Sequence, residues 1–271
     1  YSGKSVSLSA DGSVVAIGAA NNDGNGTNSG HVRIYKNVND TWTKVGGDID
    51  GESSYDDSGS SVSLSSDGSI VAIGAPDNIA NGYSGHVRVY KNVNNIWTQV
   101  GSDIDGEANG DDSGISVSLS SDGSVVAIGA SRNEGNGTLS GHVRIYQNIN
   151  NTWNKVIEDI DGEGENDQSG YSVSLSSDGT IVSIGAPNND GNGGDSGHVR
   201  VYQIHSITLE TQTVSASELI SLDAQYSGTV NASSVNTITG SAADVNSVYA
   251  SSTTSSQTTL CLLYTSDAAD E

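Results

Sequence analysis

The sequence predicts an all-β fold, a β-propeller of four-stranded antiparallel blades, on three observations. First, residues 1–206 contain four tandem copies of one repeat unit, which begin at residues 2, 58, 113 and 169. Second, each copy holds four short apolar stretches separated by Gly, Asn and Asp turn signals. Third, these stretches alternate or are β-branched, without helical periodicity. Units of this length that bury their apolar faces against one another are typical of propeller blades.

The elements of one unit are clearest in the second copy. Residues 61–65 alternate apolar side chains with serines, and residues 70–75 form a β-branched run that predicts a strand buried on both faces. Between them, Asp67-Gly68 predicts a two-residue hairpin turn. Residues 86–92 alternate again, and residues 96–101 give a short outermost strand that carries Trp97. The alternative architecture is a β-solenoid, whose coils usually repeat at shorter intervals.

The copies differ at the two ends of the repeat region. The fourth copy stops after Gln203 without its tryptophan strand, and the chain starts inside a repeat at Tyr1. Propellers usually close by completing one blade with a strand from the other terminus. We therefore expect the four copies to be part of a larger ring whose missing strand lies before Tyr1.

Two further segments do not continue the repeat. Residues 207–260 are rich in Ser, Thr and Asn, and we interpret them as a linker or a partial repeat, with two short helices flanking a strand-like segment. They are similar to Ser/Thr/Asn-rich tandem modules in large surface proteins of marine bacteria. Residues 261–271 read CLLYTSDAADE and resemble the translation of a sequencing adapter, so we treat them as a non-native tail. This tail contains the only cysteine, Cys261.

Composition excludes several kinds of partner. The formal net charge is −23 with only 10 Lys and Arg, so we expect no nucleic-acid partner, because phosphate binding needs basic stripes. No apolar run approaches the roughly 20 residues that span a bilayer, so we expect no direct membrane insertion. A strongly acidic surface suits a salty or divalent-rich medium and favours cation binding.

Residues 110–130, with GDDSGISVSLSSDGSVVAIGA, and residues 140–146, with SGHVRIY, resemble the FG-GAP repeat of integrin-α-like propellers. The resemblance covers residues 2–203 and implies a seven-bladed, extracellular propeller used for adhesion or ligand binding. It departs from the family at two points. The family's calcium loop between the first two strands is reduced here to SSDGS or a close variant. Serine also stands in place of the family's phenylalanine, at Ser58, Ser113 and Ser169.

A different loop is the best calcium candidate. In the first and fourth copies, the loop after the second strand places oxygen ligands at positions one, three and five, followed by Gly. The candidate metal ligands are Asn21, Asp23, Asn25, Asn188, Asp190 and Asn192. The second and third copies each lose one of these ligands. The alternative is a polar turn that uses Asn and Gly for their tolerance of positive φ.

Three other recurring patterns have structural alternatives. The acidic loop between copies, as in residues 48–57, either binds a divalent ion or caps backbone N–H groups. The SGHVR frames are expected to make blade-to-blade hydrogen bonds rather than one shared site. The tryptophans are expected to pack between blades as anchors and not to line a ligand site. These two sets are His31, His86, His142 and His198, and Trp42, Trp97 and Trp153.

These observations predict a non-enzymatic extracellular adhesion or recognition module of a secreted or cell-surface protein, which calcium stabilises. Its expected partner is a protein or glycan ligand. One alternative is a glycan-active, sialidase-like propeller enzyme, although SSDGS lacks the aromatic residue of the sialidase turn. Another is a passive spacer in a giant surface protein. No Ser-His-Asp frame, catalytic carboxylate pair or phosphate-binding Gly loop stands out in the sequence.

Overall fold

The computed structural model describes residues 2–78 and 82–204, together with the short segments 207–208, 213–217, 230–231, 237–239, 241 and 260–261. The chain divides into two compact units. The first comprises Tyr1–Lys155 and Asp159–Gln203, and the second comprises Val156–Glu158 and Ile204–Glu271. Within the described part of the chain, no helix has the length and apolar character needed to cross a bilayer.

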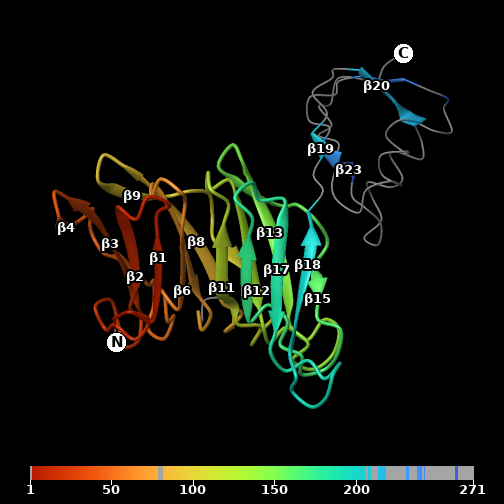
Figure 1. Cartoon of the computed structure of the whole chain (residues 1–271), viewed down its shortest axis with the longest axis horizontal. Helices are drawn as coiled ribbons and strands as arrows, with labels where there is room; N and C mark the ends of the chain where they lie inside the picture. Colours follow the sequence, from red (N-terminus) through yellow and green to blue (C-terminus); the bar gives the residue numbers. More distant parts are fainter. Residues whose placement is uncertain are drawn as a thin grey trace. The chain divides into compact units, whose positions relative to one another are not determined.

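The first unit consists of four antiparallel sheets, one for each repeat, which are the blades of a β-propeller (Figure 1). Blade 1 contains β1 (Ser5–Leu8), β2 (Val14–Gly18), β3 (His31–Val38), β4 (Thr41–Lys44) and β5 (Ile49–Asp50). Blade 2 contains β6 (Ser61–Leu64), β7 (Ile70–Ala75), β8 (His86–Val93), β9 (Ile96–Gln99) and β10 (Ile104–Asp105). Blade 3 contains β11 (Ser113–Leu119), β12 (Val125–Ala130), β13 (His142–Ile149), β14 (Thr152–Lys155) and β15 (Ile160–Asp161). Blade 4 contains β16 (Ser172–Leu175), β17 (Ile181–Ala186) and β18 (His198–Gln203).

The predicted strands of the second copy are all present, but the outermost position is more complex than predicted. The long third strand β8 pairs through Tyr90–Val93 with β9 and through His86–Val87 with β10. The outer strand of blades 1 to 3 is therefore made of two pieces, and the second piece, Ile-Asp, falls in what the sequence alone presents as the start of the acidic loop. Blade 4 has no counterpart of either piece among its described residues.

The hairpin between the first two strands of each blade forms at the predicted Asp-Gly dipeptide, but its loop is longer than two residues. In blade 2 the amide of Ser65 donates to the carbonyl oxygen of Ile70 (2.9 Å), which leaves four residues between these two. Gly68 has φ of +69°, a region that Gly enters without strain. Oδ1 of Asp67 accepts from the Ser65 hydroxyl (2.7 Å) and the Ser69 amide (2.9 Å). Burial raises the pKa of Asp67, but these hydrogen bonds outweigh burial and lower the pKa overall. The same bonds hold the loop in its conformation.

Consecutive blades stack face against face in chain order, and we call each contact a junction. The core of the first junction combines β2, β3 and β5 of blade 1 with β6, β7 and β8 of blade 2, through buried Val, Ile and Leu side chains. The second junction repeats this arrangement between blades 2 and 3. Strand β7 is buried on both faces, as the sequence predicts, because it lies between two junctions.

Close approach at the junctions depends on glycine in the second strand. A Cβ added to Gly74 would overlap the carbonyl oxygen of Gly114 in the next blade, and a Cβ on Gly129 would overlap that of Gly170. Beside this approach, the Ser61 hydroxyl donates to the carbonyl oxygen of Gly114 (2.7 Å). The serine and glycine content of the first two strands therefore permits backbone-to-backbone packing between blades.

The second unit is described only in short pieces. Strand β19 (Ile207–Thr208) pairs in parallel with β21 (Val230–Asn231), and β21 pairs in parallel with β23 (Leu260–Cys261). Strand β20 (Thr213–Ser215) pairs in parallel with β22 (Thr237–Thr239). Parallel pairing was not predicted for this segment. The two predicted helices fall mostly on residues outside the described ones.

Candidate functional site

The predicted calcium ligands lie in the loop between the second and third strands, where three of them, Asp23, Asn25 and Asp190, already bond to the backbone. Oδ1 of Asp23 and Oδ1 of Asp190 each accept a hydrogen bond from the main-chain N–H five residues later, at 2.8 Å in both loops. Asn25 donates its side-chain amide to the carbonyl oxygen of Gly51 (2.7 Å), while its counterpart Asn192 is exposed. One ligand oxygen in each loop therefore stabilises the turn, and the calcium site stays a prediction.

The first position of this loop faces the end of the acidic loop. In blade 2, Asp77 fills the position and hydrogen-bonds to Asp57, and burial together with the Asp77 charge raises the pKa of Asp57 to about 6. In blade 3, Nε of Arg132 pairs with Oδ2 of Asp112 (3.1 Å). The same position in blades 1 and 4 holds the predicted ligands Asn21 and Asn188.

The blade 1 loop is the better of the two calcium candidates, because it lines an open hollow of about 550 Å³ with further carboxylates. Lys44 and Arg33 both bind Asp48, and the pKa of Asp48 is held far below its usual range chiefly by its hydrogen bond to Arg33. The side chain of Asp50 also faces the hollow. The lining therefore fits a cation at Asp23 and Asp50 better than at Asp48, whose charge is already neutralised.

The acidic loop uses its most buried carboxylate as a cap. Oδ2 of Asp56, which has no exposed surface, accepts the amides of Glu52 (2.9 Å) and Ser53 (2.7 Å). The counterparts Asp111 and Asp167 likewise accept an amide of their own loop, from Ala108 and Gly164, and each also accepts the side-chain amide of a buried asparagine. The capping alternative is therefore confirmed for this position of the loop.

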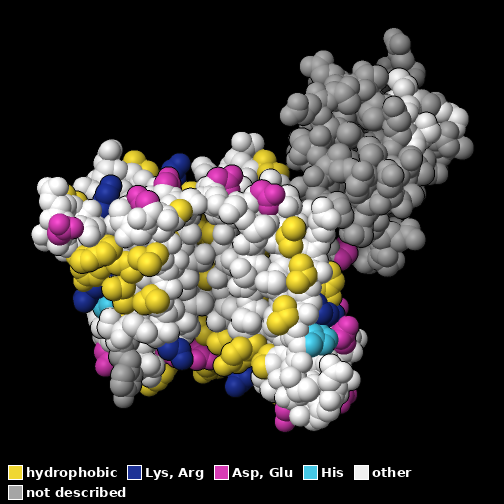
Figure 2. All heavy atoms as spheres, in the orientation of Figure 1, with side chains coloured by type: hydrophobic (Ala, Val, Ile, Leu, Met, Phe, Trp, Pro, Cys, Tyr) yellow, Lys and Arg dark blue, Asp and Glu magenta, His cyan; other side chains and the backbone are white. Residues whose placement is uncertain are grey.

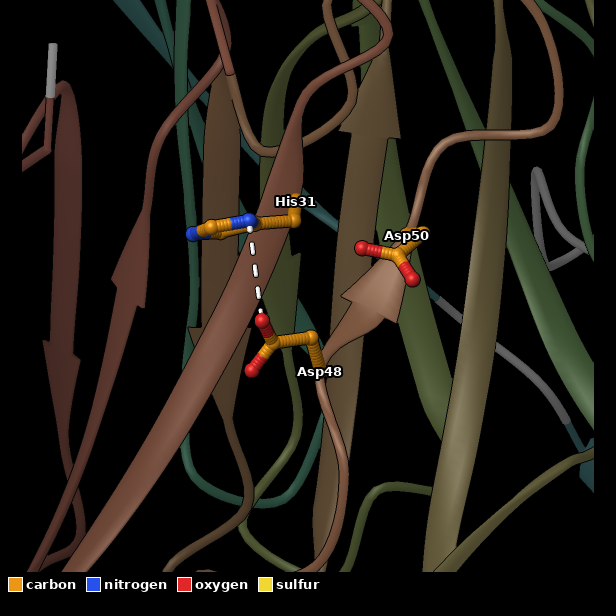
Figure 3. A group of neighbouring side chains, drawn as sticks. All are labelled: His31, Asp48 and Asp50. Atoms are coloured by element: carbon orange, nitrogen blue, oxygen red, sulfur yellow. Dashed lines mark ion pairs between the residues drawn. The ribbon is translucent and has the colours of Figure 1, made fainter. Parts of the chain in front are cut away.

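A His–carboxylate group recurs at the base of the third strand, and the sequence analysis did not assemble it. In blade 1 it consists of His31, Asp48 and Asp50, with Nδ1 of His31 3.9 Å from Oδ2 of Asp48 (Figure 3). The other two groups are Glu52 with His86 and Asp103, and Glu107 with His142 and Asp159. A signal was present in the sequence, because the first three copies each repeat the His, the Arg two residues later and an Asp at the same distance after the His, as in His31 and Asp48.

In blades 2 to 4, the arginine two residues after the histidine bonds to the preceding blade. Nη2 of Arg88 donates to the carbonyl oxygen of Asp50 (2.8 Å), and its Nη1 lies 3.4 Å from Glu52. Arg144 and Arg200 repeat both contacts with Asp105 and Glu107, and with Asp161 and Glu163. We call this pair of contacts the arginine lock. We expected the histidine to make the blade-to-blade hydrogen bond, but the arginine two residues later makes it.

The His–carboxylate groups at the closed junctions do not fit a metal ion. Burial and the adjacent Arg144 lower the pKa of His142 to about 4, and burial and Arg88 lower that of His86. Both imidazoles are therefore neutral, which is the form that ligates metals, so it is the arginines that oppose a metal ion. The guanidinium of Arg88 already supplies positive charge to Glu52. A divalent ion would place a second positive charge beside this buried arginine, which is unfavourable in a low dielectric.

Trp97 and Trp153, which follow a preceding blade, pack between blades as predicted. Nε1 of Trp97 donates to the carbonyl oxygen of Val45 in blade 1 (2.9 Å), and Nε1 of Trp153 donates to Val100 in blade 2 (2.8 Å). Both indoles pack against the junction cores. Trp97 also lines a shallow groove at the outer side of the first junction.

The loops between the second and third strands and the acidic loops between blades lie at one edge of the blades, which we call the loop rim. The rim comprises residues 21–29, 77–78, 82–84, 132–140 and 188–196 from the first kind of loop, and residues 51–57, 106–112 and 162–168 from the acidic loops. The sets are tied by backbone hydrogen bonds, such as those from Tyr55 to Thr27 (2.7 Å) and from Gly110 to Tyr83 (2.9 Å). Tyr55 and Tyr83 have φ of 68° and 65°, yet their side chains are 54% and 56% exposed. A positive φ is costly for a bulky residue, and here no burial of the ring offsets the cost.

Comparisons with known proteins support the fold only. No family model matches the chain, and no curated protein matches it. Among solved structures it is similar to a candidate 6-phosphogluconolactonase from Bacteroides uniformis (14% identity, TM-score 0.50, 74% of this chain and 50% of that chain). It is also similar to a candidate TolB from Agrobacterium tumefaciens (12% identity, TM-score 0.43, 74% of this chain and 57% of that chain). A third similar structure is the C-terminal WD40 domain of Sif2 (16% identity, TM-score 0.43, 73% of this chain and 45% of that chain).

The chain thus spans about half the length of these solved structures. At such low identity the similarity concerns architecture and not activity. The repeat region stacks one antiparallel sheet per repeat, three of five strands and the last of three, which is how the blades of a β-propeller are organised. The repeat region of the chain has the β-propeller fold.

Proposed function

We propose that this chain is a non-enzymatic recognition module of a secreted or cell-surface protein, which binds a protein or glycan ligand through its loop rim. The observation that carries the proposal is the pair Tyr55 and Tyr83, exposed aromatic side chains on strained backbone at the rim. The other copies also have positive φ at these two turn positions, for example at Asn166 and Asn28, so the backbone conformation belongs to the repeat and the exposed rings are what Tyr55 and Tyr83 add. Tyrosine supplies large, rigid contact area at low entropic cost.

The arrangement of polar groups supports the same proposal. The arginines of blades 2 to 4 are engaged in locks, and the buried aspartates cap their own loops. Exposed acids such as Glu134 and Glu165 remain on the rim, in the loops of blade 3. We further propose that the blades are of the FG-GAP type and belong to a ring with more than four blades.

Binding is tested with labelled chain on a glycan array and on a panel of purified cell-surface proteins. We expect Tyr55→Ala and Tyr83→Ala each to weaken binding about tenfold or more, as for aromatic interface anchors. Ile96→Ala, at the opposite edge of blade 2 and also exposed, is the matched control and should not change binding. A wild-type chain that binds nothing on either panel, or that cleaves array glycans, would overturn the proposal.

The proposed calcium stabilisation has a separate test. The melting temperature is compared in millimolar calcium chloride and in sodium chloride of equal ionic strength. We expect a calcium-specific rise that the double substitution Asp23→Asn and Asp190→Asn removes, since asparagine keeps the turn acceptor but loses the charge. Binding to the folded state alone adds about 2.7 kcal/mol at a hundredfold excess over Kd. Identical melting curves in the two salts would show that these loops are turns only.

A further inference from the structure

The first two junctions each bury a histidine that no hydrogen bond satisfies. His86 begins β8 and His142 begins β13, and both residues are 1% exposed. Nε2 of each ring is buried and has no hydrogen-bond partner in the described part of the chain. On the face of the molecule drawn in Figure 2, little histidine surface is visible, in keeping with this burial. A buried nitrogen without a partner makes the charged form of the ring costly.

Charged groups from both blades of the second junction face His142. They are Arg144 on its own strand, Glu107 and Asp111 in the acidic loop from the preceding blade, and Lys155, Asp159 and Asp161 in its own blade, where Asp161 is its partner in the strand register. Glu107 lies 3.5 Å from Nη1 of Arg144, and Asp159 lies 3.1 Å from Nζ of Lys155. These two carboxylates are therefore already paired with cations, and the guanidinium beside the ring opposes a further positive charge.

The first junction repeats this arrangement around His86. The groups that face it are Arg88 on its own strand, Glu52 and Asp56 in the acidic loop from the preceding blade, and Asp103 and Asp105 in its own blade, where Asp105 is its register partner. Nδ1 of His86 lies 4.0 Å from Oδ2 of Asp103, which is beyond hydrogen-bond distance. Asp103 instead accepts the side-chain amide of Gln99 (2.6 Å). Both rings thus lie beside the arginine lock without a bonded acceptor.

We propose that the junctions between blades are acid-sensitive, and that His86 and His142 are the groups through which acid weakens them. Each ring lies where the acidic loop of one blade meets the third strand of the next, so a charge placed there acts on the contact between blades. A proton on the buried ring costs free energy beside the arginine, whereas in separated blades water can reach the ring. The repeat therefore carries one proton-sensitive side chain at each of these two junctions.

The direction of the pH dependence follows from the folded chain. Burial, followed by Arg144, lowers the pKa of His142 from 6.5 to about 4, so the unfolded chain takes up the proton at higher pH than the folded chain. The contribution of His142 to stability is complete above about pH 6.5, is lost as the pH falls toward 4 and changes little below that value. At pH 5 this loss corresponds to an unfolding equilibrium constant about 30-fold larger for this ring alone.

The test is urea denaturation of the full chain at pH 8 and pH 5 at equal ionic strength. Tryptophan fluorescence follows it, because Trp97 and Trp153 pack in these two junctions. The unfolding constant of wild type is divided by that of His142→Gln, whose amide does not titrate in this range. We expect this ratio to rise at least about tenfold from pH 8 to pH 5, and the corresponding ratio for His86→Gln to rise as well.

The controls separate the ring from its surroundings. Asp40→Asn, at an exposed acid of an outer hairpin, should leave the ratio the same at both pH values. His142→Asn replaces His142→Gln if the latter does not fold. A ratio for His142 that stays within about twofold between pH 8 and pH 5 overturns the proposal, whatever the substitution costs at pH 8.

A second measurement does not depend on denaturation. Proton NMR follows the titration of the histidine ring signals in the folded chain, and the signal missing from His142→Gln identifies His142. We expect a midpoint well below 6.5. A midpoint at or above 6.5 would contradict the proposal, because it would mean that the neighbouring carboxylates stabilise the protonated ring.

Discussion

The outer face of blade 1 and the junction between blades 1 and 2 contain the same residues in different surroundings. At the junction, Arg88 crosses to the Asp50 carbonyl oxygen, and its side chain is 6% exposed. At the outer face, its counterpart Arg33 forms a two-pronged pair with Asp48 of its own blade and is 44% exposed. The tryptophans differ in the same way, since Trp97 bonds to the preceding blade whereas Trp42 is 47% exposed.

This difference shows that the repeated polar residues act between blades. The strands of each unit pair with one another, but its arginine, tryptophan and core valines gain their partners only from a neighbouring unit. The stability of such an array is a sum of unit and junction contributions. In this chain, the repeated arginines and tryptophans contribute mainly to the junctions.

The largest effect is expected at the tryptophans. Trp97→Ala removes an indole that packs in the first junction and leaves the Val45 carbonyl oxygen without its donor, so it should cost about 3 kcal/mol of unfolding free energy. Trp42→Ala, at the exposed counterpart, should cost less than about 1 kcal/mol. Chemical denaturation of the two variants measures both values. Equal costs would mean that the first junction contributes nothing at Trp97.

The arginine lock should give a somewhat smaller difference. Arg88→Leu removes a buried guanidinium together with its hydrogen bond to the Asp50 carbonyl oxygen and its contact with Glu52, and should cost about 2 kcal/mol. Arg33→Leu breaks a half-exposed pair with Asp48 and should cost less than about 1 kcal/mol. The same denaturation experiment applies. A cost for Arg33→Leu as large as that for Arg88→Leu would show that the lock adds nothing beyond an ion pair.

The smallest effect concerns pH. The pKa of Asp57 rises from 3.8 to about 6 in the folded chain, so folding favours its protonated form. Its destabilising effect is absent below the lower value, grows as pH rises between the two and is complete above about 6. Asp57→Asn should therefore raise the melting temperature at pH 8 and leave it unchanged at pH 3. The exposed Asp40→Asn is the control, and a rise that is equal at both pH values would contradict the assignment.

The strands could be predicted from the sequence because their signals are local. Alternation in residues 61–65 and the β-branched run 70–75 locate β6 and β7, and the loss of the tryptophan strand after Gln203 anticipates a three-stranded last blade. The short strand β10 was missed because two residues carry no periodicity. Its pairing depends on the length of β8, which extends past the hairpin with β9.

The site was harder to predict because its contacts are not local. Arg88 bonds to a main-chain oxygen 38 residues earlier, and a carbonyl acceptor leaves no trace in residue identity. The hydrogen bond from the Asn25 side-chain amide to the Gly51 carbonyl oxygen, across 26 residues, is another such contact. The spacing of Asn21, Asp23 and Asn25 resembles a calcium loop, but the spacing alone does not reveal which oxygens the backbone already uses.

The central claim, that equivalent residues act through the neighbouring blade, is tested most directly by one glycine position. A Cβ on Gly129 would overlap the carbonyl oxygen of Gly170 in the next blade, whereas a Cβ on its counterpart Gly185 meets closely only the movable hydroxyl of Ser172. Unfolding free energies of Gly129→Ala and Gly185→Ala are compared. We predict that Gly129→Ala loses about 3 kcal/mol or fails to fold, while Gly185→Ala stays within about 1 kcal/mol of wild type. Equal losses at the two positions would contradict the claim.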